Sequence, residues 1–294
     1  LLASERKRQS ILRKELAWVQ RGAQARSTKQ KARLMRYEEM KNADAPVTDG
    51  KVEIGSASSR LGRTTVELSH VSKGYDDRIL IRDFSYIFLY FDRVGFVGRN
   101  GCGKTTLMKM LTGKTQPDEG QILIGQTVKI GYYAQEIGET EMPPDQKVID
   151  YIRDTAEFVQ TGDGPVSASK MLEKFLFEGK DQYGLLKKLS GGEKRRLHLL
   201  KILMGAPNVL ILDEPTNDLD ITTLTVLEDY LDSFEGIVII VSHDRYFLDR
   251  TVRRIFAFEE NGTLRQYEGN YTDYHSRMIA ENGEAVKQGK EQKK

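Results

Sequence analysis

Short apolar runs rich in β-branched residues alternate with helical stretches from residue 64 onward. The runs at 209–212 and 237–241 are apolar throughout, which is typical of parallel strands buried on both faces of a sheet. Alternation of such strands with helices predicts an α/β domain with a mainly parallel core sheet. Strands are expected at 65–68, 94–97, 121–124, 128–132, 209–212 and 237–241.

Three other segments have their own patterns. Residues 145–205 contain almost no strand signal, and we interpret them as a helical subdomain inserted between elements of the sheet. Residues 42–63 are rich in Gly, Ser, Ala and Asp, which predicts a linker. Beyond about residue 275 the chain is polar and rich in Lys, Glu and Gln, so residues 276–294 are expected to form a disordered tail.

The first 41 residues are predicted to form a basic helical hairpin. Leu12, Leu16 and Val19 follow the i, i+4, i+7 spacing of one helix face. Gly22 suits the end of that helix, and a capping box at 27–30 begins a second one. Residues 6–36 carry eleven basic side chains and one acidic side chain. Such a charge run indicates either an arm with a binding partner or a solvated helix pair without one.

The composition is that of a soluble globular protein. Hydrophobic residues make up 39% and charged residues 30% of the 294 positions, and the net charge is only +2. The apolar runs have strand length and no secretory signal is present, so no membrane insertion is expected. The one cysteine, Cys102, excludes an internal disulfide and a cysteine-based zinc site, and suits a cytoplasmic protein. Because the chain opens on Leu1, we interpret it as a fragment.

The strongest chemical motif directly follows the strand at 94–97. Residues 98–105 match G-x-x-x-x-G-K-[ST], in which the glycines fold the backbone into a nest of N–H donors for phosphate. Lys104 is expected to reach the β- and γ-phosphates, and the Thr105 hydroxyl to ligate Mg²⁺. A mere glycine turn with a surface lysine is disfavoured by the strand before the motif and the helix after it. The predicted nucleotide contacts of this glycine-rich loop are Gly98, Asn100, Gly101, Cys102, Gly103, Lys104, Thr105 and Thr106.

Two further strands lead directly to candidate catalytic side chains. The strand at 209–212 delivers Asp213 and Glu214 to the edge at which open α/β sheets bind ligands. Asp213 would hold Mg²⁺, and Glu214 would accept a proton from the attacking water or orient it. Taken alone, this strand end would also fit a helix N-cap. The strand at 237–241 precedes His243, which is expected near the same phosphates, whereas the remaining histidines are interpreted as structural: His70, His198 and His275.

Together these motifs resemble the ATP-binding cassette (ABC) family over about residues 64–275. Six elements of the family occur in the family's order, with the helical segment between the Q-loop and the signature motif. The matching residues are Tyr75 (base-stacking aromatic), 98–105 (Walker A), Gln135 (Q-loop), 189–196 (signature motif), 213–220 (Walker B and D-loop) and His243 (H-loop).

This resemblance implies a P-loop NTPase fold with an antiparallel β-subdomain and an inserted helical subdomain. It implies ATP and Mg²⁺ as cofactors, with Gln135 joining Thr105 and Asp213 at the metal. Lys104, Glu214 and His243 would be the catalytic residues. In this family two cassettes sandwich two ATP molecules, and Tyr75 would stack on either purine, so ATP rather than GTP rests on the resemblance alone. The contacts expected in trans are Ser190, Gly191, Gly192 and Asp220.

Two segments are similar to the ABC-F group: 214–220, and 242–248. Residues 5–41 resemble the helical linker arm that joins two ATPase domains in ABC-F proteins. The resemblance implies the end of that arm followed by the second cassette. Its partners would be a second ABC ATPase domain, in the full-length chain or as a homodimer, and the ribosome, reached through contacts of the arm with rRNA or tRNA. The alternatives are the nucleotide-binding subunit of a membrane transporter and an ATPase whose arm binds DNA.

Two positions depart from the family pattern. Cys102 stands where a small residue is usual, and it is interpreted either as a small filler or as an oxidation-sensitive thiol at a helix N-terminus. Residues 88–92 are apolar where the family has a polar turn, so the local turn there is expected to differ.

Overall fold

The computed structural model describes residues 62, 64–76, 78–134, 142–161 and 164–291, with side chains described up to residue 281. These residues all belong to the second of the two units into which the chain divides, residues 53–294. The predicted arm, nearly all of the predicted linker, and Gln135 lie outside the described residues.

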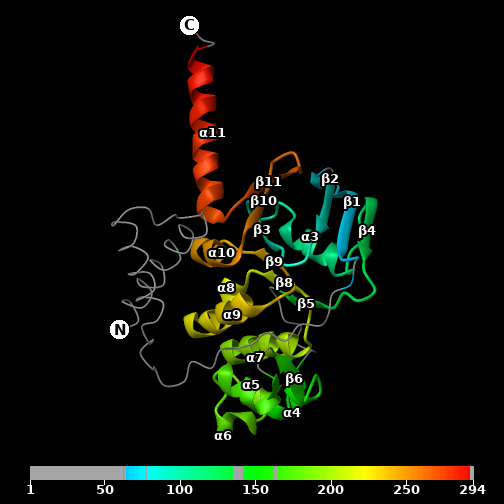
Figure 1. The fold of residues 1–294 in the computed structure, drawn as a ribbon, viewed down its shortest axis with the longest axis vertical. Helices are drawn as coiled ribbons and strands as arrows, with labels where there is room; N and C mark the ends of the chain where they lie inside the picture. Colours follow the sequence, from blue (N-terminus) through cyan, green and yellow to red (C-terminus); the bar gives the residue numbers. More distant parts are fainter. Residues whose placement is uncertain (1–61, 63, 77, 135–141, 162–163, 292–294) are drawn as a thin grey trace, which may run out of the picture. The chain divides into compact units, whose positions relative to one another are not determined.

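A six-stranded sheet runs through the described residues in the order β11-β10-β3-β9-β8-β5 (Figure 1). Strands β10, β3, β9, β8 and β5 are parallel, and β11 adds antiparallel at one edge. The predicted mainly parallel core is therefore confirmed, whereas β10 and β11 lie outside the strands expected from the sequence. The bounds are β3 Arg93–Val97, β5 Ile130–Tyr133, β8 Val209–Asp213, β9 Ile237–Val241, β10 Arg254–Phe258 and β11 Leu264–Glu268.

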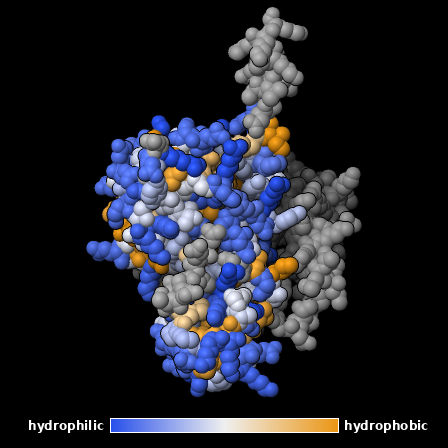
Figure 2. All heavy atoms as spheres, turned by 180° about the vertical axis from the view of Figure 1, so that it is seen from behind, coloured by the Kyte–Doolittle hydropathy of each residue, from blue (hydrophilic) through white to orange (hydrophobic). Residues whose placement is uncertain are grey.

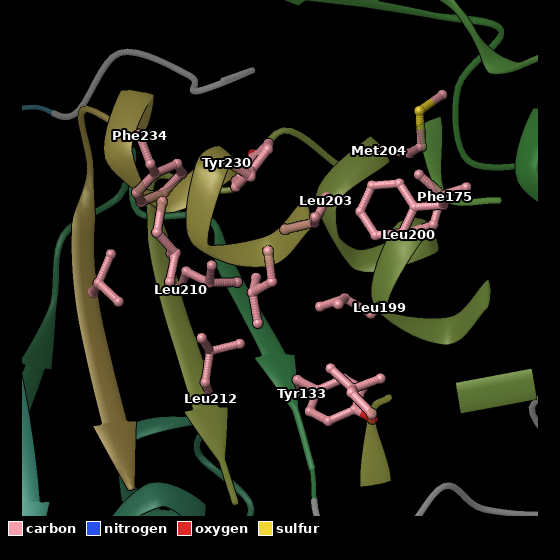
Figure 3. Packing of buried hydrophobic residues seen from close by; sticks show 14 of the residues in the cluster. Tyr133, Phe175, Leu199, Leu200, Leu203, Met204, Leu210, Leu212, Tyr230 and Phe234 are labelled. Carbon is pink, nitrogen blue, oxygen red and sulfur yellow. The ribbon is translucent and has the colours of Figure 1, made fainter. Parts of the chain in front are cut away.

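The central strands are buried on both faces because alternate side chains enter opposite hydrophobic clusters. In β8, Leu210 and Leu212 pack into one cluster, and Val209 and Ile211 into the other. The first cluster includes residues of helices α7 (Gly191–Met204) and α9 (Ile221–Ser233), as Figure 3 shows for Leu203. The second includes residues of α3, which directly follows the glycine-rich loop. The helices of the nucleotide-binding half are α3 Lys104–Leu111, α8 Pro215–Asp218, α9 Ile221–Ser233 and α10 Arg245–Thr251.

Beside this sheet lies a three-stranded antiparallel sheet in the order β2-β1-β4. It consists of β1 Val66–Tyr75, β2 Arg78–Phe88 and β4 Glu119–Ile124. The antiparallel β-subdomain expected from the family resemblance is thus confirmed. β1 continues well beyond the strand predicted at 65–68, through shifts in its pairing with β2 after Leu68 and Val71 that disrupt the apolar alternation.

The inserted segment is mainly helical, but it contains a small hairpin that the sequence analysis did not predict. Strands β6 Phe158–Thr161 and β7 Gly164–Ser167 pair antiparallel within it. Each strand has four residues, which is too short for a periodic pattern to identify. The helices of this subdomain are α4 Val148–Arg153, α5 Ala168–Lys174, α6 Gly179–Gln182, the 3₁₀ turn η2 Leu186–Lys188 and α7 Gly191–Met204.

The C-terminal segment corrects one expectation. Helix α11, Tyr271–Glu291, occupies most of the stretch that was expected to be a disordered tail (Figure 1). Asn270 and Asp273 cap its start reciprocally, each side chain accepting from the other residue's backbone N–H at 3.0–3.1 Å. Tyr274 and Met278 pack against the hydrophobic cluster of α7 and α9. The polar composition of this segment therefore gave no indication of a helix whose first turns are capped and packed against the domain.

The turn at 88–92 exposes apolar side chains. Leu89 and Phe91 are 59% and 58% exposed, and Phe91 has a φ of 63°. Asp92 holds the turn by accepting from the Leu89 N–H and the Tyr86 hydroxyl, both at 2.9 Å. On the face seen in Figure 2, hydrophobic residues form scattered patches among hydrophilic ones. No described helix is long and apolar enough to cross a bilayer.

Arg93 joins the first residue of β3 to the end of α9. Its guanidinium donates to the carbonyl oxygens of Gly236 at 2.9 Å, Leu231 at 3.2 Å and Phe234, and lies 5.7 Å from the Phe234 ring centroid. Carbonyl groups in the last turn of a helix lack N–H partners within the helix. The Arg93 guanidinium donates to carbonyl groups at and just beyond the end of α9. Burial lowers the pKa of Arg93 to about 10, so the side chain stays protonated at neutral pH.

Arg93→Ala is expected to lower the free energy of unfolding by about 2–4 kcal/mol, because three carbonyl groups lose a charged donor. Urea unfolding of the nucleotide-free protein measures this change. Arg153→Ala, which removes an exposed arginine from the helical subdomain, serves as the control and should change the free energy by less than about 0.5 kcal/mol. Equal effects of the two substitutions would contradict a role for Arg93 in joining these elements.

Candidate functional site

The glycine-rich loop connects β3 to α3, and two of its glycines are required by conformation. Gly101 and Gly103 have φ angles of 71° and 115°, in the region that side chains other than glycine rarely adopt. A β-carbon at Gly103 would also lie 3.0 Å from the Leu80 Cβ. The loop therefore wraps its backbone N–H groups around the start of a helix, which is the arrangement that binds phosphate.

The Lys104 ammonium group is held by the loop itself. Lys104 is 7% exposed, and its Nζ donates to the carbonyl oxygens of Gly98 at 2.9 Å and Arg99 at 3.1 Å. Both acceptors lie at the start of the same loop. The positive charge is thus fixed across the nest, where a phosphate group can bind it.

Asp213 ends β8 with its carboxylate fully buried. Its Oδ2 accepts from the Tyr132 hydroxyl at 3.3 Å, whereas no partner reaches its buried Oδ1. Burial raises the pKa of Asp213, and hydrogen bonds from Thr105 and Tyr132 oppose that rise. Burial likewise raises the pKa of Tyr132, so its hydroxyl keeps the proton it donates. The fold thus leaves one carboxylate oxygen available to a ligand beside Thr105.

Glu214 and His243 form a contact pair at the adjoining strand ends. Glu214 is 5% exposed and has the left-handed conformation φ 54°, ψ 50°, which is uncommon outside glycine and frequent at functional sites. Its Oε1 lies 3.3 Å from His243 Nε2, and its Oε2 accepts from the His243 backbone N–H at 3.3 Å. The imidazole is about half exposed, so one side of the pair faces solvent.

One pocket of about 500 Å³ gathers most of these residues. Tyr75, which is 50% exposed, lines it together with Lys104, Asp213, Glu214 and His243. Gly98 and Cys102 are outside its lining, and the Cys102 sulfur lies against Gly98 instead. The remaining residues of the lining are Leu80, Asn100, Gly101, Gly103, Thr105, Thr106, Asn217 and Val241.

The predicted trans residues do not line this pocket among the described residues. Ser190 caps α7 through a reciprocal bond with Glu193, whose carboxylate accepts from the Ser190 N–H at 2.8 Å and hydroxyl at 2.7 Å. These bonds lower the pKa of Glu193. Gly191 and Gly192 are exposed at the first turn of the helix. Asp220 caps α9 by accepting from the Thr223 N–H at 2.8 Å, which lowers the pKa of Asp220.

Sequence reasoning missed some contributions to the site. Leu80, from the unpredicted strand β2, lies against the glycine-rich loop, and Tyr132 supports Asp213 from β5. A tyrosine on a neighbouring parallel strand carries no motif, so only the register of β5 with β8, which pairs Tyr132 with Ile211, places it. The histidines interpreted as structural lie elsewhere: His70 pairs with Asp83, His198 lies 6.0 Å from the Tyr133 ring and His275 stacks on Tyr271.

Comparisons with known proteins agree with this geometry. Residues 81–217 match the family described as ABC transporter. The chain is 54% identical over 271 residues to the uncharacterized ABC transporter ATP-binding protein YfmR of Bacillus subtilis, covering 92% of this chain and 43% of that protein. It is 40% and 38% identical to the energy-dependent translational throttle protein EttA of Mycobacterium tuberculosis and of Escherichia coli, over 93% and 92% of this chain and 50% and 49% of theirs. The chain spans about half the length of these curated relatives.

Solved structures share the fold. The ATP-binding subunit of an ABC transporter aligns with a TM-score of 0.59 at 19% identity, covering 70% of this chain and 90% of that chain. The dimeric ADP- and phosphate-bound cassette MJ0796 aligns with a TM-score of 0.55 at 20% identity, covering 69% and 98%. The α/β P-loop fold and the resemblance to ABC-F proteins inferred from the sequence are therefore confirmed. Residues 81–217 therefore carry the domain that the ABC transporter family model describes, and over most of its length the chain is similar to proteins named as ABC transporter ATP-binding protein and EttA.

Proposed function

We propose that this chain binds Mg²⁺-ATP and hydrolyses it together with a second ABC cassette, as an ABC-F type ATPase that acts on the ribosome in the cytoplasm. The observation that carries the enzymatic part is the convergence of Lys104, Asp213 and the Glu214–His243 pair on one pocket. The ribosomal part rests on the relatives named EttA, which align over more than nine-tenths of the chain.

ATP binding follows from the loop and the pocket rim. The N–H groups of the glycine-rich loop and the Lys104 ammonium bind the phosphates, and Tyr75 stacks on the adenine. The unpartnered Asp213 Oδ1 and the neighbouring Thr105 hydroxyl are hard oxygen donors, so the residues present fit Mg²⁺. Asp213 and Thr105 would hold the ion, which when bound neutralises phosphate charge.

Hydrolysis uses the Glu214–His243 pair. The Glu214 carboxylate accepts the proton of the attacking water, and its contact with His243 fixes its direction. His243 and Lys104 donate to the γ-phosphate as charge develops on it. Glu214, whose backbone has the left-handed conformation, lines the pocket.

A second cassette completes the site. Ser190, Gly191 and Gly192 present the positive N-terminus of the 14-residue helix α7 outside their own pocket. These N–H groups bind the γ-phosphate held by the partner's glycine-rich loop, and Asp220 links the two sites. Catalytic electrostatics thus assemble only on closure, and ATP acts as a clamp between the cassettes.

Asp213→Asn is expected to stabilise the nucleotide-free protein by about 1 kcal/mol at pH 7.5 while abolishing Mg²⁺-dependent ATP binding. The pKa of Asp213 is higher in the folded than in the unfolded state. The wild type therefore loses stability as the pH rises through the range between these two pKa values. The difference between the two proteins should therefore shrink at lower pH, where Asp213 becomes protonated.

Urea unfolding with EDTA at two pH values measures the effect, with the exposed Asp181→Asn of the helical subdomain as control. A variant less stable than wild type at both pH values would show that the Asp213 charge does not destabilise the nucleotide-free protein.

Glu214→Gln is expected to reduce ATP turnover by about 100-fold or more and to leave ATP affinity within about threefold. The amide keeps the size of the side chain but cannot take a proton. Phosphate release and nucleotide titration give the two quantities, and Glu157→Gln, at an exposed position of the helical subdomain, is the matched control. Unchanged turnover in the Glu214 variant would remove this residue from catalysis.

Cosedimentation with ribosomes tests the cellular role. The Glu214→Gln protein with ATP is expected to pellet with ribosomes more than the same protein with ADP, because only ATP holds the clamp closed. The comparison is repeated with membranes and with duplex DNA. Nucleotide-dependent retention on membranes would instead favour a transporter subunit, and preference for DNA over ribosomes would favour a DNA-associated ATPase.

A further inference from the structure

Arg78 lies beside the base-stacking tyrosine at the end of the β1–β2 hairpin. Tyr75 and Arg78 are cross-strand partners, and side chains in such pairs stand about 5 Å apart at their β-carbons. Tyr75 lines the nucleotide pocket. The hairpin that supplies Tyr75 therefore holds a guanidinium group beside it, just outside the residues that line the pocket.

The start of β2 also faces the glycine-rich loop. Side chains two residues apart in a strand share a face, so Arg78 and Leu80 point the same way. A β-carbon built on Gly103 would lie 3.0 Å from the Leu80 Cβ, and one built on Gly101 would lie 3.9 Å from Arg78 Nη1. Apart from Gly101 itself and the residues next to it in the chain, no other described atom comes within 4 Å of that position. Arg78 thus borders the open space over the middle of the loop.

The positively charged side chains around the loop differ in whether they form hydrogen bonds or ion pairs within the protein. Lys104 is bonded to two loop carbonyls, and the Arg99 guanidinium forms an ion pair with Glu260 at 3.0 Å. Arg78 forms no hydrogen bond or ion pair with any residue in the described part of the chain. Its five N–H donors are therefore available to a ligand, and a guanidinium matches phosphate oxygens well.

We propose that Arg78 is a phosphate-binding residue of the nucleotide site, acting on the nucleotide bound to its own glycine-rich loop. This inference rests on the proposed binding of ATP and adds a contact that none of the matched motifs supplies. Arg78 closes the loop's outer side over the phosphate chain, while Lys104 holds it from within. One short hairpin would then grip the nucleotide at two points, with Tyr75 on the base and Arg78 on the phosphates.

Isothermal titration of Mg²⁺-ADP and a non-hydrolysable ATP analogue tests the proposal, with Mg²⁺-pyrophosphate measured by competition. Arg78→Gln is expected to weaken all three by about tenfold, as loss of one charge-assisted hydrogen bond at an exposed site would. Arg78→Lys should restore affinity to within about threefold, because the charge is kept. Arg153→Gln removes the same charge from an exposed position of the helical subdomain and should change nothing.

Three results would overturn the proposal. Wild-type affinity in Arg78→Gln would show that the guanidinium does not contact the ligand. Weaker ADP binding with unchanged pyrophosphate binding would assign Arg78 to the base or ribose. An equal loss in the Lys and Gln variants, with a lower thermal midpoint of both nucleotide-free proteins, would make its role structural. Failure of the wild type itself to bind nucleotide would reject the proposed function, a result distinct from these three.

Discussion

The site depends on a carboxylate that the parallel sheet buries at its carboxyl edge. Asp213 is completely inaccessible, yet one of its oxygens has no partner. A buried ionised group is costly unless it is paired, and it is tolerated here because the Tyr132 hydroxyl donates to it and the surrounding strands fix its position. The same lack of a partner makes the group a strong ligand for a cation. In the proposed function, the buried Asp213 charge lowers the stability of the nucleotide-free protein, and the binding of Mg²⁺-nucleotide restores that stability.

The sequence predicted the core of the fold because the governing patterns are local. Uninterrupted apolar runs at β8 and β9 can be satisfied only by strands covered on both faces, and the structure places alternate residues of β8 in two separate clusters. The glycine-rich loop was equally legible, since the left-handed conformations of Gly101 and Gly103 restrict these positions almost to glycine. Strand ends carrying Asp213 and His243 then had to meet at one edge of the sheet.

What the sequence could not show depends on contacts between distant segments. The strand β2 is recognisable only in its pairing with β1, whose register shifts break any simple alternation. Arg93 is one charge among many until the end of α9 is brought to it. Helix α11 was mistaken for a tail because its polar residues outnumber the few, such as Tyr274 and Met278, that anchor it. Long-range geometry, rather than residue type, decides each of these cases.

The position of the signature motif, residues 189–196, is the main structural reason to expect a second cassette. A helix N-terminus with exposed N–H groups is a ready anion site, and α7 begins with two exposed glycines that follow its N-cap residue, Ser190. These groups do not line the pocket that holds Lys104 and Asp213 among the described residues. Electrostatic stabilisation acts over short distances, so a phosphate in that pocket gains from such a helix only when another cassette supplies it. In the proposed function, part of the electrostatic stabilisation of the transition state therefore comes from a different domain. Hydrolysis then requires the two cassettes to close on each other and not only the binding of ATP.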